Sequence, residues 1–392
     1  MDKNIYLDHA ATTFVKDEVL KEMLPYFTEN FGNASTVYRL GQKCKAALDN
    51  ARQTVADAMG CEANEVYFTA SGSEADNWAI KGAARLNRKK GNHIITSAIE
   101  HHAVLHTCQA LEKEGFEVTY LPVDEYGKVS AEDVKNAIKD TTILITIMYA
   151  NNEIGTIEPI AEIAKIAKEK GILMHTDAVQ AAGAVPISFK ELGVDMLSLS
   201  AHKFNGPKGV GALIIRKGIR IENLIEGGAQ ERGKRAGTEN VAGIVGLAAA
   251  LKSANDAIAE KSSKLCEMRD YIIKNIEDKI PYCRLNGHRT DRLPNNVNFS
   301  FEYIEGEGML LWLDFYGIAA SSGSACTSGS LDPSHVLLAI GLDHATAHGS
   351  LRITLGDENT YEEIDYTIEK LCETVEKLRM MSPLYEGVKG DK

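Results

Sequence analysis

The chain has 392 residues, of which 44% are hydrophobic and 25% charged, and its formal net charge at pH 7 is −12. A chain of this length exceeds the usual size of one hydrophobic core, so two domains, or one large and one small, are expected. The acidic balance argues against a general nucleic-acid binder, which needs a basic face.

Residues 1–10 lack the apolar core of a secretory signal, and the longest apolar run, residues 241–251, is too short to span a bilayer. The seven cysteines are scattered and include no Cys-x-x-Cys pair. This pattern is typical of reduced intracellular thiols, not of a disulfide framework or a zinc site. The sequence therefore predicts a cytoplasmic protein with no membrane partner and no resident metal.

Short β-rich runs alternate with helical periods between residues 65 and 215. Strands are expected at 66–69, 93–96, 116–121, 143–147, 172–175, 196–199 and 212–215, and helices at 74–88, 103–114, 131–138 and 160–170. The alternation predicts an α/β fold with a mainly parallel seven-stranded sheet and helices on both faces. Ligands of such sheets bind at the carboxyl ends of the strands.

The second part of the chain predicts a smaller body. Residues 239–280 are expected to be helical and to bridge to it. Strands are then expected at 296–301, 318–320 and 351–354, and helices at 308–315, 333–339 and 361–380. We therefore expect a large domain over residues 15–260 and a small α+β domain built from residues 1–14 and 261–392.

Lys203 lies in the run Ser200-Ala-His-Lys-Phe-Asn-Gly-Pro-Lys-Gly209, directly after an apolar run at 194–199. A lysine at the end of a buried strand is a candidate for Schiff-base formation. A desolvated or cation-flanked amine loses its proton readily, and only the neutral amine attacks an aldehyde. Taken alone, this lysine could equally be a solvated loop residue.

Two motifs that follow other predicted strands have both a functional and an ordinary interpretation. Residues 71–74 (Ser-Gly-Ser-Glu) open a predicted helix, so Gly72 and Ser73 could cradle a phosphate. A simple helix cap is the commoner use of such residues. In residues 100–102 (Glu-His-His), His101 could stack on a flat ring or move protons, or it could be an exposed loop histidine.

Two further motifs complete the set. Asp177, in the run 175–180 (His-Thr-Asp-Ala-Val-Gln), could hold a pyridine nitrogen protonated or could cap a helix. Residues 151–155 (Asn-Asn-Glu-Ile-Gly) are typical of a turn but could present a donor to a phenolic oxygen. Together the five motifs supply every group that pyridoxal 5′-phosphate needs, and one shared cofactor explains them better than five coincidences.

The sequence resembles the cysteine desulfurases of iron–sulfur cluster assembly and nitrogen fixation, which are fold-type I pyridoxal-phosphate enzymes. The resemblance covers nearly the whole chain, through the runs 6–13, 32–35, 151–155, 200–209, 227–240, 321–329 and 351–356. Residues 321–329 (Ser-Ser-Gly-Ser-Ala-Cys-Thr-Ser-Gly) are similar to the subgroup with a long mobile cysteine loop. Three residues depart from the family pattern. Tyr38 and Tyr149 stand where many relatives have histidine, and Ala229 replaces a glycine of the usual Gly-Gly-Gly run.

The resemblance implies the roles of the site residues. Lys203 carries the cofactor, Asp177 contacts the ring nitrogen, and His101 stacks on the ring and exchanges a substrate proton. Arg352 binds the substrate carboxylate beside Asn152, because a planar guanidinium suits bidentate binding. The other implied cofactor ligands are Gly72, Ser73, Ser200 and His202 at the phosphate, Asn152 and Gln180 at the ring hydroxyl, and Thr238, which reaches a phosphate across the interface of a homodimer.

The implied reaction removes sulfur from L-cysteine, releases L-alanine and leaves a persulfide on Cys326. Small flexible neighbours suit a thiol that must visit both the cofactor and an acceptor. The persulfide would pass to acceptor proteins such as an iron–sulfur cluster scaffold, and Cys326 can transiently ligate iron or a cluster during transfer.

Other functions stay open at this point. The alternative enzymes are a selenocysteine lyase and a fold-type I aminotransferase, and the alternative of another class is a non-enzymatic sulfur carrier or scaffold. Cys326 disfavours an aminotransferase, which needs no mobile thiol. The joint presence of Lys203, Asp177 and Arg352 disfavours a carrier without catalysis. No direct nucleic-acid partner is expected.

Overall fold

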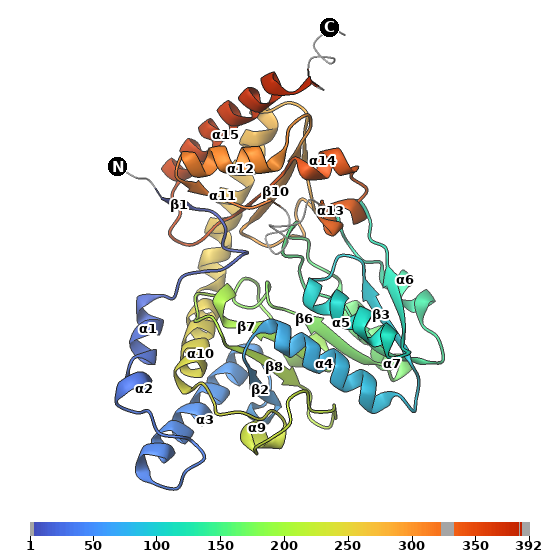
Figure 1. Ribbon diagram of the computed structural model, residues 1–392, viewed down its shortest axis with the longest axis vertical. Coiled ribbons are helices and arrows are strands. Elements are labelled where there is room, and N and C mark those ends of the chain that lie inside the picture. The colour runs from blue at the N-terminus through green and yellow to red at the C-terminus, as the bar shows by residue number, and fades with distance from the viewer. Residues whose placement is uncertain (1–3, 323–332, 384, 386–392) are drawn as a thin grey trace.

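A computed structural model describes residues 4–322, 333–383 and 385 of the chain, so Cys326 lies outside the described residues. Figure 1 shows the large sheet and its helices in the lower part of the view, and α12, α15 and β10 in the upper part. Helices α10 and α11 run between the two parts. The candidate site lies between the part that contains the large sheet and the part that contains β12.

A seven-stranded sheet with strand order β2-β8-β7-β6-β5-β3-β4 is the centre of the larger part. Strands β4, β3, β5, β6 and β7 are parallel, whereas β8 is antiparallel to both neighbours. The bounds are β2 (Val66–Thr69), β3 (His93–Ser97), β4 (Glu117–Leu121), β5 (Thr142–Thr146), β6 (Leu173–Asp177), β7 (Met196–Ser200) and β8 (Gly211–Ile215). The predicted mainly parallel sheet is confirmed.

Helices cover both faces of this sheet, because successive residues of its strands point into different cores. Ile94 of β3 packs in a core with α4 and α5, whereas Ile95 packs in a core with α3, α6, α7 and α10. Apolar side chains on both faces are what a covered parallel sheet requires. The bounds are α3 (Arg39–Met59), α4 (Gly72–Asn87), α5 (His102–Lys113), α6 (Ala131–Ala137), α7 (Ile160–Lys170) and α10 (Val241–Asp256).

Helix α3 was not predicted from the sequence. Its buried side chains include Cys44, Leu48 and Val55, whose spacing of four and seven residues places them on one face. The helix ends at Gly60, whose φ of 66° is a left-handed conformation that glycine adopts readily. Shorter elements of this part are α1 (Asp17–Met23), α2 (Pro25–Thr28), η1 (Ala63–Glu65), α8 (Phe189–Leu192), η2 (Ala201–Lys203) and α9 (Gln230–Gly233).

The smaller part has its own sheet and core. Its sheet is antiparallel with order β12-β10-β9, and β1 pairs in parallel with β11. Ile5 and Leu7 from the N-terminal segment pack in this second core. The division at residues 14/15 and 260/261 stays a prediction. The bounds are β1 (Ile5–Tyr6), α11 (Ile258–Lys279), β9 (Cys283–Leu285), β10 (Asn296–Phe301), α12 (Gly306–Phe315), β11 (Ile318–Ala319), α13 (His335–Ala339), α14 (His344–His348), β12 (Ser350–Thr354) and α15 (Tyr361–Met381).

The helical stretch expected at 239–280 is two helices, α10 and α11, with Ala257 between them. The two helices are bent by 70° relative to each other. Within the described parts of the chain, no single helix is long and apolar enough to cross a bilayer, and α10 with α11 meets that length and composition only as a bent pair.

A buried ion pair joins α3 to the segment after β8. Arg52 donates from both terminal nitrogens to the carboxylate of Glu231, at 2.7 Å each. The side chains are 10% and 3% exposed. The same carboxylate accepts the backbone N–H of Phe68 at 2.9 Å, and Arg52 also donates to the carbonyl of Val66 at 2.6 Å. This network connects α3 to the edge strand β2.

We predict that Glu231→Ala lowers the free energy of unfolding by about 3–5 kcal/mol, because it leaves the Arg52 charge buried without its partner. Urea unfolding followed by circular dichroism measures the change. The control is Glu114→Ala, which removes an exposed ion pair with Arg85 and should change the unfolding midpoint little. Equal effects of the two substitutions would contradict the prediction.

Candidate functional site

The carboxyl ends of β2, β3, β5, β6 and β7 border one cavity of about 350 Å³, a volume within the range of small-molecule sites. The N-terminal segment and β12 of the smaller sheet close it from the other side. Ten predicted site residues line this cavity: Gly72, Ser73, His101, Asn152, Asp177, Gln180, Ser200, His202, Lys203 and Arg352.

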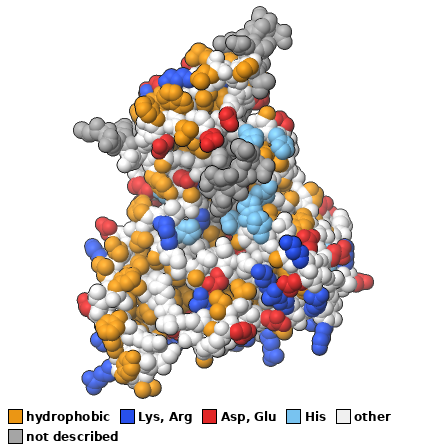
Figure 2. All heavy atoms as spheres, viewed as in Figure 1, with side chains coloured by type: hydrophobic (Ala, Val, Ile, Leu, Met, Phe, Trp, Pro, Cys, Tyr) orange, Lys and Arg blue, Asp and Glu red, His pale blue; other side chains and the backbone are white. Residues whose placement is uncertain are grey.

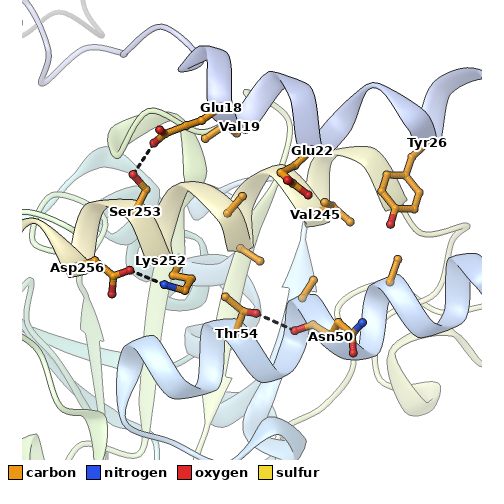
Figure 3. A pocket seen from close by; sticks show the side chains of 14 residues that line it. Glu18, Val19, Glu22, Tyr26, Asn50, Thr54, Val245, Lys252, Ser253 and Asp256 are labelled. Carbon is orange, nitrogen blue, oxygen red and sulfur yellow. Dashed lines mark hydrogen bonds and ion pairs between the residues drawn. The ribbon is translucent and has the colours of Figure 1, made fainter.

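A larger hollow of about 600 Å³ lies between α1, α3 and α10 (Figure 3). Glu18 of α1 accepts a hydrogen bond from Ser253 of α10 at 2.6 Å across it, and Tyr26 borders one end. None of the described residues predicted for the site lines this hollow. Convergence of reactive groups, and not size, therefore identifies the smaller cavity as the candidate site.

Lys203 reaches the cavity from the short turn η2, which directly follows β7. Its Nζ donates to the carbonyl oxygens of Ala10 and Ala11, at 2.5 and 2.9 Å. The side chain is half-buried. These two hydrogen bonds hold the amine at the cavity wall.

Asp177 ends β6 and is 6% exposed. Burial raises the pKa of its carboxyl, although a hydrogen bond from the backbone N–H of Val179 at 2.9 Å and the charge of Lys203 act in the opposite direction. The carboxyl caps a turn and no helix begins there. A buried carboxylate in this position is stabilised by any cationic N–H group that enters the cavity.

Helix α4 begins at the cavity with Gly72, and Ser71 is its N-cap, accepting the N–H of Glu74 at 3.1 Å. The helix-cap interpretation is therefore correct for Ser71. A Cβ on Gly72 would lie only 2.7 Å from Val179, so glycine alone fits and the backbone can approach a ligand. The free N–H groups of the first turn favour an anion. Buried Ser200 lies beside this helix end, and half-buried His202 lines the same cavity.

His101 precedes α5 and lines the cavity, with its Nδ1 accepting the N–H of Ala103 at 3.1 Å. Burial, and next the charge of Lys203, lowers its pKa to about 4, so the imidazole is neutral at pH 7. The ring of His102 lies 5.0 Å from that of His106 and 4.9 Å from that of His335. Figure 2 shows histidine side chains gathered on this face of the molecule.

Arg352 is 1% exposed and comes from β12, in the second sheet. Its guanidinium donates to the carbonyl of Asn152 at 3.0 Å and to the carboxylate of Asp8 at 2.8 Å. Gln180 donates to the carbonyl of Ala10 at 3.0 Å. Asn152 and Gln180 thus line the cavity beside Arg352 and Ala10.

Two predicted site residues are not placed at this cavity. Thr238 is exposed and borders a different hollow beside Phe68 and Glu231. Cys326 lies outside the described residues, so its place stays a prediction. The chain has seven cysteines, and the six that lie in the described parts of the chain are free thiols.

Four acidic residues near the cavity had no role in the sequence interpretation: Asp8, Asp76, Glu100 and Glu153. Asp76 is 1% exposed, and burial, and next the charge of Asp177, raises its pKa. Burial raises the pKa of Glu153 to about 7. Asp8 lies inside the run 6–13 and Glu153 inside the run 151–155, so the motifs contained them. Glu100 likewise lies inside the run 100–102, whereas Asp76 had no signal beyond proximity to the run 71–74.

Comparisons with known proteins give a consistent result. The chain matches the family described as Aminotransferase class-V over residues 5–367. It is 61% identical to a cysteine desulfurase IscS of Clostridium botulinum over 394 aligned positions, which cover 100% of this chain and 99% of that protein. It is 60% identical to a cysteine desulfurase IscS of Methanosarcina thermophila, with 98% of this chain and 95% of that protein covered.

Solved structures agree with the fold. A NifS-like protein superposes with a TM-score of 0.90 at 39% identity, covering 96% of this chain and all of that chain. The structure described as SspA in complex with cysteine superposes with a TM-score of 0.81 at 38% identity, covering 90% of this chain and 98% of that chain.

We predict that Glu100→Gln alters the dependence of stability on pH. Glu100 is 0% exposed, and burial raises its pKa from 4.5 to about 8. The folded state therefore binds more protons than the unfolded state between these two values, and the free energy of unfolding falls as pH rises through that window. The fall attributable to this group is at most about 1.4 kcal/mol per pH unit.

The Gln variant cannot ionise, so its urea-unfolding free energy should fall less than that of the parent between about pH 5 and about pH 8. The control is Glu114→Gln on the exposed surface, which should keep the parental slope. The same pH slope in the parent and in Glu100→Gln would show that Glu100 ionises normally.

Proposed function

The chain belongs to the aminotransferase class-V family and is a pyridoxal-phosphate-dependent cysteine desulfurase, and from this we propose which of its residues perform the reaction. The reaction converts L-cysteine and an enzyme thiol into L-alanine and an enzyme persulfide. The convergence of Lys203, Asp177 and Arg352 on one cavity is the observation that supports the assignment most strongly.

The residues that line the cavity fit the cofactor in three respects. Gly72 leaves room that a Cβ would fill, the first turn of α4 offers free N–H groups to a phosphate, and the buried carboxyl of Asp177 at the cavity can stabilise a cationic ring N–H group. Pyridoxal 5′-phosphate supplies an aldehyde that bonds to an amine and a ring that stabilises negative charge at the substrate α-carbon.

Lys203 is the amine that we assign to covalent attachment. Its position between the cavity and the carbonyls of Ala10 and Ala11 lets the released amine stay near the substrate α-carbon. There Nζ takes the α-proton as a general base. Only the neutral form of the amine can take this proton.

We assign Asp177 and His101, which line the same cavity, to proton control in the reaction. The carboxylate of Asp177 keeps a proton on a ring nitrogen, because its burial makes an ionic hydrogen bond strong. His101, neutral at pH 7 because burial lowers its pKa, can stack against a flat ring and exchange a proton with the substrate.

We further assign the phosphate and ring-oxygen contacts to residues that line the cavity. Gly72, Ser73, Ser200 and His202 are assigned to the phosphate, because all four line the cavity into which the start of α4 opens. Asn152 and Gln180 are assigned to the ring hydroxyl. Arg352 is assigned to the substrate carboxylate, with Asn152 beside it.

Cys326 is the nucleophile that we assign from the sequence. Its thiolate attacks the sulfur of the substrate, a new S–S bond forms, and the carbon–sulfur bond breaks with its electron pair left on the carbon fragment. Protonation of that fragment gives alanine. We propose that the persulfide passes to an acceptor protein such as an iron–sulfur cluster scaffold. The cytoplasmic location expected from the cysteines stays a prediction.

We also propose that the protein is a homodimer in which Thr238 of one protomer contacts the cofactor of its partner. Thr238 is exposed and away from the cavity of its own chain. Large apolar side chains are exposed along residues 14–38, among them Phe31 at 68% and Val37 at 94%. Figure 2 shows hydrophobic side chains over the region of α1 to α3, an unusual amount for a surface that faces only water.

Lys203→Ala and Cys326→Ala separate the two halves of the proposed reaction. Lys203→Ala should lose covalently held cofactor, measured as the mass of the borohydride-reduced protein, and should lower alanine production by at least a thousandfold, about 4 kcal/mol at the transition state. Cys326→Ala should keep the covalent cofactor but lose the persulfide, measured by mass spectrometry after L-cysteine is added.

The matched control is Cys61→Ala, since burial raises the pKa of the Cys61 thiol to about 12 and keeps it protonated. This variant should form the persulfide normally. Alanine release at the parental rate by Lys203→Ala would refute the lysine assignment. Persulfide formation by Cys326→Ala would show that another cysteine is the nucleophile.

Phe31→Asp should weaken the proposed dimer at least roughly tenfold, because a charge would be buried at the apolar interface. Sedimentation velocity over a range of concentrations measures the dimer dissociation constant. Phe315→Asp is the control, since Phe315 is 76% exposed on α12, far along the chain from residues 14–38. A parent that sediments as a monomer, or a Phe31→Asp variant that dimerises normally, contradicts the proposal.

A further inference from the structure

We propose that Asp8 is a positioning residue that makes the site select substrates with a free α-carboxylate, because it fixes the guanidinium of Arg352. The inference rests on the proposed function, in which Arg352 binds that carboxylate. Asp8 would touch neither the substrate nor the cofactor, and would act only through the arginine.

Both carboxylate oxygens of Asp8 are engaged. Oδ1 accepts from Nη2 of Arg352 at 2.8 Å, and Oδ2 accepts from Oγ of Ser321 at 2.6 Å. The side chains of Asp8 and Arg352 are 15% and 1% exposed. A charge-assisted bond in so dry a place holds its partners more firmly than an exposed ion pair does.

The guanidinium of Arg352 is held from two sides and still has donors to spare. Nη1 donates to the carbonyl of Asn152 at 3.0 Å, while Nη2 donates to Asp8. Nε is buried and has no hydrogen-bond partner among the described residues. A guanidinium has five N–H groups, so donors remain for a substrate carboxylate. Their direction is fixed by the two contacts already made.

Asp8 is itself held firmly by the backbone around it. The N–H of Leu7 donates to Ala319 at 2.8 Å, and the N–H of Thr354 donates to Leu7 at 2.8 Å. The segment therefore lies between β11 and β12, the strand that carries Arg352. A carboxylate on such a support can set the plane of a guanidinium, whereas one on a mobile loop could not.

Two effects of Asp8 on substrate binding oppose each other, and they predict different behaviour. If Asp8 orients Arg352, its removal weakens binding of a carboxylate. If its negative charge mainly competes with the substrate for Arg352, its removal strengthens binding. We expect orientation to dominate because the side chain accepts from Arg352 and Ser321 at the same time, which leaves it little freedom to move aside.

The experiment uses the cofactor-loaded enzyme and compares kcat/KM for L-cysteine with that for L-cysteine methyl ester, which lacks the carboxylate charge. Asp8→Ala should lower kcat/KM for L-cysteine by about ten- to a hundredfold, mainly through KM, and should change the value for the ester little. Asp8→Asn should stay within about threefold of the parent, because its oxygen can accept from Arg352 and its amide can donate to Ser321.

Asp357→Ala is the matched control. Asp357 forms an ion pair with Lys16 at 2.9 Å between the two parts of the chain and does not line the cavity. This variant should keep the parental preference for L-cysteine. If Asp8→Ala does not fold, Ser321→Ala decides: it removes one support of Asp8 and should lower the preference about threefold, and an unchanged preference would overturn the inference.

Arg352→Gln distinguishes failure of this inference from failure of the proposed function. If Arg352→Gln keeps the preference for L-cysteine over the ester, the carboxylate role of Arg352 is wrong and the inference falls with it. If Arg352→Gln loses the preference but Asp8→Ala keeps it, Asp8 alone is wrongly assigned. A lower KM for L-cysteine in both Asp8 variants would show that Asp8 competes with the substrate.

Discussion

Parallel strands that end at one edge of a sheet are the constraint on which this site depends. The strands β3, β5, β6 and β7 each deliver a polar segment to the same cavity. Lys203 and Asp177 are thus brought together although 25 residues of chain, including α8 and β7, lie between them. No single loop could place a base, an anion and an anion-binding helix end around one small ring with comparable rigidity.

The second determinant is the burial of ionisable groups in and beside that cavity. Burial shifts ionisable groups toward their neutral forms, so it raises the pKa of Glu100 and Glu153 and lowers that of His101. In the same surroundings, the few charges that persist interact strongly. Lys203, Asp177 and Arg352 therefore dominate the electrostatics that a zwitterionic amino acid would meet there.

The N-terminal segment connects the two halves of the site. Asp8 contacts Arg352 from the smaller sheet, while the carbonyls of Ala10 and Ala11 accept from Lys203 of the larger sheet. A segment at the start of the chain thus bridges the residues assigned to the substrate carboxylate and to the amine. The segment is held by the pairing of β1 with β11 and does not form a helix. The carbonyls of Ala10 and Ala11 are therefore not used in helical hydrogen bonds and can accept from Lys203.

The sequence by itself determined the alternation of strands and helices, and with it the parallel sheet and the strand-end placement of Lys203, Asp177 and His101, because apolar periodicity and motifs are local properties. Helix α3 was not predicted, because its buried face is rich in alanine. Only the tertiary structure decided that Asp8 lies against Arg352, 344 residues away in sequence, and that Thr238 does not reach the cavity of its own chain. Contacts of this kind depend on how two sheets pack against each other, and no local pattern encodes that packing.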